Sequence, residues 1–338
     1  MRALVLLSLA VAVGTAWLIY PVILREVSSN YFVGRREFCA AHAKSYLPKT
    51  VLPGLSAWLY DKLPLPALQL LCTLLGVFEE AATPRHTNAA LAMSFLPFAC
   101  LPFMLMYSES LKSSNPLAPL WPALVGLVGQ LVGISVAFPL LWLPLFFLRR
   151  DSSSPRNAFV SLPRLLIMGL VSFFLLANIV GMFFLRSLEL RAWFIVLFQI
   201  APLFPGLLAA FTPQTNLSAS PAVRAAVYMF FGGVGALGHV IGLLALIDDP
   251  SAIGSLLRLL RADSLLGPEY VDYLLWIDFL SMLCSVAVFV LSEGGAVPAL
   301  CFLVLGPVFS PGLVLAVILS QREYRPPSAS SSLKQKTK

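Results

Sequence analysis

The chain has 338 residues, of which 59% are hydrophobic and only 12% are charged, and its mean hydropathy is +0.86. An ordinary soluble domain carries about a quarter charged residues, so this composition excludes a soluble fold that buries its apolar side chains in one core. The formal net charge of +7 does not indicate nucleic-acid binding, because the Lys and Arg residues flank apolar runs and form no basic patch with interleaved aromatic residues.

Apolar runs long enough to cross a membrane recur along the sequence. A span needs about 20 apolar residues, and in the absence of water its backbone groups must be satisfied within the segment, which favours helices. The sequence therefore predicts an all-α fold, a polytopic integral membrane helical bundle with about eight transmembrane helices plus a re-entrant or interfacial segment. The predicted spans are 3–24, 88–107, 118–148, 164–185, 192–211, 225–247, 273–291 and 297–320.

Three apolar runs differ from a simple straight span. The run 3–24 is long for the apolar part of a signal peptide and is followed by a poor cleavage site, so we expect a retained first helix rather than a cleaved one. Within the segment 25–87, the weaker apolar run 64–78 suits an interfacial or re-entrant helix better than a ninth span. The run 118–148 is too long for one straight span, and its four prolines predict a tilted, kinked helix or one that projects from the bilayer.

The simplest organisation is a single membrane domain, 1–325, followed by a disordered tail, 326–338, rich in Ser and Lys. Lys and Arg are nearly balanced between the two sides, so they do not decide the orientation in the membrane. The cysteines are scattered singly without a CxxC motif, and at least three lie in apolar runs, where a free Cys behaves as a small hydrophobe. They are Cys39, Cys72, Cys100, Cys284 and Cys301.

Asp278 is the ionisable residue that lies most clearly inside a predicted span. It stands about six residues into that run, near Trp276 and Phe279 and with no basic residue within one helical turn. A charged group there costs at least ~2.5 kcal/mol, so it is a functional candidate by default. Burial without a cation favours the neutral carboxylic acid, which can deliver a proton to an apolar substrate. The alternative is a carboxylate near the interface, solvated or paired with an Arg of another helix.

Two further carboxylates join Asp278 as catalytic candidates. Glu80 follows another glutamate at the end of the weak apolar run, where the alternative is a solvated helix end. Glu293 lies between the last two predicted spans. It either marks a loop or, since Gly294 and Gly295 allow a tight turn, lies under Asp278. The sequence therefore adds Glu80 and Glu293 to Asp278 as catalytic candidates.

Polar and aromatic residues inside the spans form a candidate substrate-binding set. They either line an interior or hydrogen-bond between helices, and inward aromatic rings can stabilise a carbocation. The candidates are Trp276, Asn178, His239, Gln130 and Trp142. His239 is surrounded by glycines, which predict a closely packed helix. The sequence has no metal-ligand spacing and no nucleotide-binding or aspartate-rich diphosphate motif, so we predict no metal and no cofactor.

Three stretches carry a resemblance to a known family. They are LWPALVGLVGQLVGISVAFPLLW (120–142), YLLWIDFLSMLCSVAVF (273–289) and LVLGPVFSPGLVLAVILSQREY (303–324). By them the chain resembles the membrane-bound terpene cyclases of fungal meroterpenoid pathways, in particular the eight-span branch associated with ascochlorin- and ascofuranone-type products. It departs from the family at Val308, where a Gly-Pro-Gly motif would have its second glycine, and its N-terminal carboxylates match no family motif.

The resemblance implies protonation of an epoxide or a terminal alkene on a farnesylated aromatic substrate, followed by cation cyclisation and deprotonation. Asp278 would then be the acid, and Glu80 or Glu293 would assist or take the final proton. The implied partners are a small prenylated substrate and the lipid bilayer, and we expect a multi-pass protein of the endoplasmic reticulum.

Two other hypotheses remain. A transporter or efflux protein for a small apolar metabolite would use the same polar residues and proline-broken helices. A membrane scaffold would tolerate substitution of Asp278 and His239. An enzyme needs its acids to converge on one closed apolar cavity, whereas transport needs a path open to one side.

Overall fold

The computed structural model describes residues 2–26, 37–41, 64–69, 72–73, 86–113, 115–150, 160–184, 188–248, 254 and 269–324. In this part of the chain the ordered elements are helices, and a single antiparallel bridge between Ser161 and Ser218 is the closest approach to a strand. Most of the segment 25–87, including Glu80, and the predicted tail 326–338 lie outside the described residues. The all-helical prediction is confirmed for the rest.

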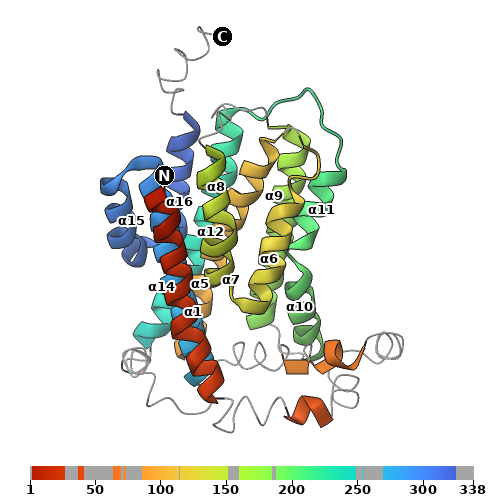
Figure 1. Cartoon of the computed structure of the whole chain (residues 1–338), viewed down its shortest axis with the longest axis vertical. Coiled ribbons are helices and arrows are strands. Elements are labelled where there is room, and N and C mark those ends of the chain that lie inside the picture. The colour runs from red at the N-terminus through yellow and green to blue at the C-terminus, as the bar shows by residue number, and fades with distance from the viewer. Residues whose placement is uncertain are drawn as a thin grey trace.

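Figure 1 shows the helices as one bundle of mostly lengthwise elements. In chain order they are α1 (Arg2–Glu26), α5 (His86–Leu111), α6 (Leu120–Val132), α7 (Ile134–Ala137), the π-helix η1 (Phe138–Trp142), α8 (Leu143–Arg150), α9 (Leu162–Phe184), α10 (Leu188–Ile200), α11 (Leu203–Phe211), α12 (Pro221–Asp248), α14 (Glu269–Gly294), α15 (Ala296–Phe309) and α16 (Pro311–Tyr324).

Four of these helices are long and apolar enough to cross a membrane: α1, α5, α12 and α14. The pair α10 and α11 makes a fifth crossing helix if it is taken as one span, bent by 53° at Ala201 and Pro202. Eight spans are therefore not confirmed. Two of the predicted spans, 118–148 and 297–320, are each divided into shorter helices by a break in the backbone.

The first break makes a hairpin of the run 118–148, where we predicted one kinked helix. Gly133 separates α6 from α7 with φ +90°, a conformation that side chains with a Cβ rarely adopt. A Cβ added at Gly129 would lie 3.2 Å from the Cα of Ile134, so the two legs touch directly beside the turn. The prolines lie within or beside the helical legs, whereas the glycine makes the turn. The leg α7–η1–α8 then runs back along α1 (Figure 1).

The second break divides the run 297–320 at Ser310, whose φ is +152°. α15 descends from Gly295, beside the end of α14, and α16 returns to the same end, where Arg322 meets Glu293. The two legs contact each other next to the break, because a Cβ added at Gly306 would lie 3.3 Å from the Cα of Pro311. Both hairpins therefore have their legs open toward the same end of the bundle and their tips inside it.

Glycines on α12 allow that helix to lie against α5 on one side and α16 on the other. A Cβ added at Gly238 would lie 2.5 Å from the carbonyl oxygen of Met93, and one at Gly242 would lie 2.6 Å from that of Ala90. Such close approach of backbones is the usual packing of small residues between membrane helices. The close packing predicted for the helix that carries His239 is confirmed.

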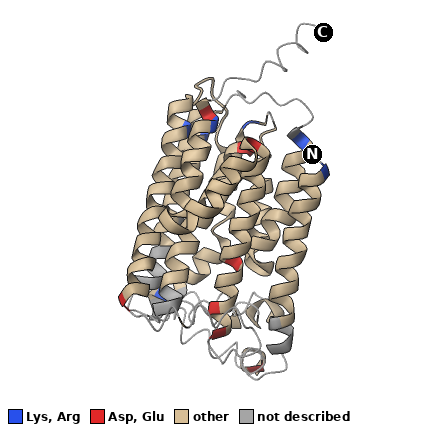
Figure 2. Cartoon of the chain, turned by 90° about the vertical axis from the view of Figure 1, so that its left-hand side faces the viewer, with Lys and Arg blue, Asp and Glu red and all other residues tan. Residues whose placement is uncertain are grey.

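Charged residues gather toward the two ends of the bundle, and the ribbon between them is almost entirely uncharged (Figure 2). Large apolar side chains are exposed along the outer surface, for example Trp17, Phe174 and Leu237, which are 76%, 62% and 62% exposed. Lipid tails can cover such a surface without loss of free energy. The structure thus supports an integral membrane protein.

Candidate functional site

Asp278 lies on α14, nine residues after the helix begins, and faces the tip of the first hairpin. The hydroxyl of Ser135, in the first turn of α7, donates a hydrogen bond to its Oδ1. A Cβ added at Gly133 would lie 3.1 Å from the same oxygen. The carboxyl group therefore packs directly on the broken backbone, and Gly133 serves both the turn and this contact.

Tyrosines from two helices hold the surroundings of this contact in place. Tyr20 of α1 donates a hydrogen bond of 3.3 Å to the carbonyl oxygen of Val132. Val132 is the last residue before the break. Tyr273 of α14 donates to the carbonyl oxygen of Leu18, at 3.2 Å. Because an unsatisfied carbonyl is costly inside a membrane, the Tyr20 hydroxyl compensates for part of the hydrogen bonding that the break removes. α1 thereby fixes the hairpin tip beside Asp278.

Aromatic rings cover the segment of α14 on either side of the acid. Trp276 stacks on Phe279 with ring centroids 6.1 Å apart, and Phe279 meets the edges of Phe95 and Phe98 of α5 at 6.4 and 6.2 Å. The indole Nε1 of Trp276 is buried and makes no hydrogen bond. The predicted residue Gln130 lies on α6, three residues before Gly133, and is partly buried. Trp276 and Gln130 are thus the predicted binding residues that lie nearest to Asp278 along these elements.

The other three predicted binding residues are engaged elsewhere. Trp142 stacks on both Phe138 and Phe146, with centroids 5.2 and 4.9 Å away, so both faces of its indole are covered by protein. Asn178 donates from Nδ2 to the carbonyl oxygen of Phe194 at 2.7 Å and joins α9 to α10. Asn178 thus hydrogen-bonds between helices, which is the alternative that the sequence left open, and Trp142 is a core residue.

His239 holds the tip of the second hairpin. Its Nε2 lies 3.0 Å from the carbonyl oxygen of Pro307, and its Nδ1 lies 3.2 Å from the hydroxyl of Ser94. A carbonyl oxygen only accepts, so Nε2 carries the hydrogen, and in the neutral ring Nδ1 accepts from Ser94. Both nitrogens are occupied, and the ring therefore positions α15 against α5 and α12.

Substitution of His239 by leucine is expected to weaken the fold by about 1–3 kcal/mol, because the carbonyl of Pro307 would lose its donor in an apolar environment. The measurement is thermal unfolding of the purified protein in detergent. The neighbouring residue Val240 is 47% exposed on the outer surface, so Val240→Ala is the matched control and should keep the wild-type transition. Equal stability of the two variants would contradict the positioning role of His239.

Glu293 does not lie under Asp278. α14 continues through Glu293 to Gly294, so fifteen residues of helix, or about 22 Å, separate the two carboxyl groups along the axis. The tight turn predicted at Gly294 and Gly295 comes only after the helix has carried Glu293 to the end of the bundle. The expected convergence of these two acids is therefore wrong, and Glu80 lies outside the described residues.

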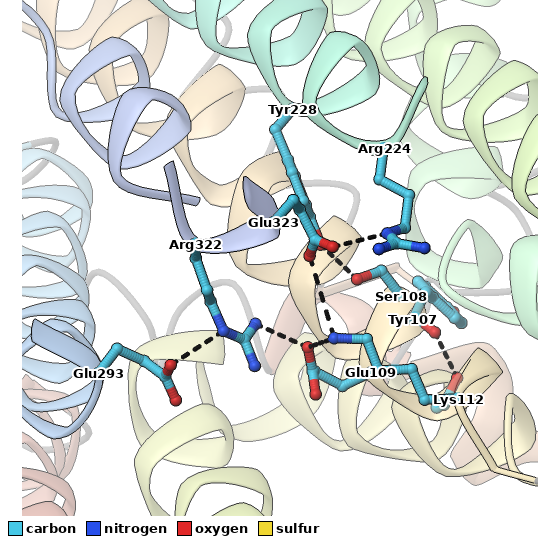
Figure 3. A network of polar contacts seen from close by, with 10 residues as sticks. Tyr107, Ser108, Glu109, Lys112, Arg224, Tyr228, Glu293, Arg322 and Glu323 are labelled. Carbon is cyan, nitrogen blue, oxygen red and sulfur yellow. Dashed lines mark hydrogen bonds and ion pairs between the residues drawn. The ribbon is translucent and has the colours of Figure 1, made fainter. Parts of the chain in front are cut away.

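Glu293 belongs instead to a buried cluster of three carboxylates and three cations, which we call the charge cluster (Figure 3). Its members are Glu109, Lys112, Arg224, Glu293, Arg322 and Glu323. Arg322 donates from Nη1 to Glu109 at 2.7 Å and from Nε to Glu293 at 2.9 Å. Arg224 donates to Glu323 at 2.6 Å. The cluster joins the ends of α5, α12, α14 and α16.

The charge cluster is balanced, because each of its three carboxylates bonds at least one of its three cations. Beside it, the hydroxyls of Ser108 and Tyr228 share a hydrogen bond, and that of Tyr107 donates to the carbonyl oxygen of Pro202. Sequence reasoning missed this cluster. The cluster ties helices together, whereas Asp278 is bonded by a neutral hydroxyl and is the acid suited to proton transfer.

No protein-family model, curated protein or solved structure matches this chain.

Proposed function

We propose that this chain is a membrane-bound terpene cyclase, in which Asp278 donates the proton that starts cyclisation of a prenylated substrate. One observation carries the proposal. The stretches 120–142 and 273–289, which bear the resemblance to such cyclases, meet where Ser135 bonds Asp278, although 143 residues separate these two side chains in the sequence. Their meeting point is an acid within the apolar part of the bundle. The endoplasmic reticulum membrane is the proposed location.

The proposed reaction needs one acid and no external reductant or oxidant. The carboxylic acid of Asp278 transfers its proton to the oxygen of a terminal epoxide, and the C–O bond to the more substituted carbon breaks. The next double bond of the prenyl chain attacks this cation and forms a C–C bond. The final cation loses a proton to a base. One proton enters and one leaves, so the product is an isomer of the substrate.

The neighbours of Asp278 suit the steps that follow protonation. The Ser135 hydroxyl bonds Oδ1 and thereby orients the carboxyl group, leaving Oδ2 as the oxygen that can carry the proton. The rings of Trp276 and Phe279 lie two residues and one residue from it on the helix, and aromatic rings attract a cation, more strongly where water is excluded. Because Glu293 is about 22 Å away, the base is the Asp278 carboxylate itself or Glu80.

A proton-coupled carrier of a small apolar molecule is the second candidate, and one observation favours it. Each of the two hairpins is broken inside the bundle, and each tip lies against an ionisable side chain, Asp278 for the first and His239 for the second. Broken helices whose tips meet at mid-membrane are common at transporter binding sites. In a carrier Asp278 would take up and release a proton without forming a product.

The test is expression in yeast microsomes that are supplied with a farnesylated phenol or its terminal epoxide, with products analysed by mass spectrometry. We expect the wild type to form cyclic products of the same mass as the substrate. Asp278→Asn should lower their yield by about a hundredfold or more, since a positioned general acid contributes 10²–10⁴-fold. Ser135→Ala should lower it by about tenfold, as expected for loss of one hydrogen bond to the acid.

Asp248→Asn is the matched control, because Asp248 is an exposed acid at the end of α12. It should retain wild-type yield, and all variants should be compared at equal amounts of folded protein. Cyclic products in equal yield from wild type and Asp278→Asn would overturn the role of the acid. Substrate that crosses sealed vesicles unchanged, with a rate that depends on a pH gradient and on Asp278, would instead establish the carrier.

A further inference from the structure

A disulfide bond joins Cys39 and Cys72 in the segment between α1 and α5. Their Cα atoms are 5.8 Å apart, and both residues are only 1% exposed. The three remaining cysteines, Cys100, Cys284 and Cys301, are free thiols on the helices. The bridge therefore involves the two cysteines that lie outside the crossing helices, and it closes a loop of the connecting segment.

The position of this bridge along the bundle follows from the helices that flank it. The connecting segment leaves the end of α1 and enters the start of α5. Tyr273, near the start of α14, bonds Leu18 near the end of α1, and Gly242, near the end of α12, packs against Ala90 of α5. These contacts lie at one end of the bundle, and Figure 1 shows the segments coloured for residues 37–41, 64–69 and 72–73 there as well. The charge cluster and Arg2 lie at the opposite end.

We infer that the Cys39–Cys72 end of the bundle lies on the lumenal or extracellular side of the membrane and that the charge cluster lies on the cytosolic side. Disulfides persist in oxidising compartments and are rare in the cytosol. Lys and Arg do not settle the question, because they flank apolar runs at both ends in similar numbers. The disulfide is thus the feature that distinguishes the two ends of the bundle. This inference does not depend on the proposed function.

This orientation has consequences for both parts of the molecule. The hairpins α6–α8 and α15–α16 enter from the cytosolic end, and their tips point toward the lumenal half. Asp278 lies nine residues from the lumenal end of α14 and sixteen from its cytosolic end, or about 14 and 24 Å along the axis. The shorter path for a proton to this acid therefore leads to the lumenal surface. The longer path, to the cytosolic surface, ends at the charge cluster.

N-glycosylation provides the test, because the modification occurs only in the lumen. Pro48→Asn creates an acceptor before Lys49 and Thr50 in the connecting segment, and Gln335→Asn creates one near the C-terminus. After expression in yeast we expect a shift in gel mobility that endoglycosidase H removes for Pro48→Asn and none for Gln335→Asn. The natural acceptor at Asn216, at the cytosolic end, should stay unmodified. A glycan on the Gln335→Asn variant or at Asn216 would overturn the orientation.

Thiol labelling keeps the inference testable if an introduced acceptor impairs folding. Ser332→Cys should react with a membrane-impermeant maleimide in sealed microsomes, above the background of the wild type, and protection of this thiol would contradict a cytosolic C-terminal region. In the denatured wild-type protein, reduction should expose two additional thiols. These should be absent from the Cys39→Ser/Cys72→Ser double variant. Full labelling before reduction would show that the bridge does not form.

Discussion

Replacement of Gly232 by alanine is expected to destabilise the protein severely, even though alanine favours a helix over glycine by about 1 kcal/mol. A Cβ at this position would overlap the Cβ of Ala316 on α16 and would lie 3.2 Å from the carbonyl oxygen of Gly312. Overpacking costs about 1–3 kcal/mol, and more where the backbone must move. We expect loss of most of the monodisperse protein when detergent extracts are analysed by fluorescence-detected size-exclusion chromatography.

The next residue on the helix provides the matched control. A Cβ added at Gly233 would meet no atom within 4 Å, so Gly233→Ala should leave the chromatogram unchanged or slightly improve it. The double variant Gly232→Ala/Ala316→Gly removes the overlap and should recover folded protein. If Gly232→Ala behaved like Gly233→Ala, or if the second substitution gave no recovery, α12 and α16 would not pack as closely as described.

The crossing helices could be predicted from the sequence because their signal is local. α1, α5, α12 and α14 each contain an uninterrupted apolar window long enough to span, so length and composition suffice. The same reasoning predicted eight spans, which are not confirmed, because hydropathy does not distinguish a straight helix from two short legs. The bend between α10 and α11 at Pro202 is likewise a backbone break that hydropathy alone does not reveal.

The two breaks depend on contacts that a local pattern does not contain. Glycine is common in membrane helices, and Gly133 stands among other glycines and apolar residues. It adopts a positive φ where Asp278 and Tyr20, from distant parts of the chain, contact the tip of the hairpin. At Ser310 the residue type does not indicate a break, since serine has no preference for φ +152°.

The candidate site was predictable only in part for a related reason. Asp278 was identified because a single acid in an apolar run carries a large energetic cost. Ser135 was missed because serine inside a span is unremarkable until its partner is known. Glu293 was expected beside Asp278 on the strength of the following glycines, but its partner is Arg322 at the far end of α14. A carboxylate near the end of a helix does not reveal which cation neutralises it.

Replacement of Arg322 by methionine is expected to cost about 3–5 kcal/mol, because it removes the buried cation that two carboxylates share. The Arg322 side chain is only 11% exposed and bonds both Glu109 and Glu293. Its guanidinium also lies 5.7 Å from the centre of the Phe289 ring. Lys112 still bonds Glu109 in the variant, whereas Glu293 loses the guanidinium that lies 2.9 Å away. Thermal unfolding in detergent should show a large decrease in the transition temperature.

Two further variants separate charge from packing. Arg322→Met/Glu293→Gln removes one of the carboxylates that Arg322 bonds together with the cation and should recover part of the loss, since residues within one ion-pair network are typically coupled by 0.5–3 kcal/mol. Arg149→Met, at an exposed position on α8, removes a cation without disturbing the cluster and should unfold like the wild type. If Arg322→Met were as stable as Arg149→Met, water would already solvate the carboxylates and the cluster would not close its end of the bundle. If the double variant were no better than Arg322→Met, the guanidinium would act through its packing on Phe289 rather than through its charge.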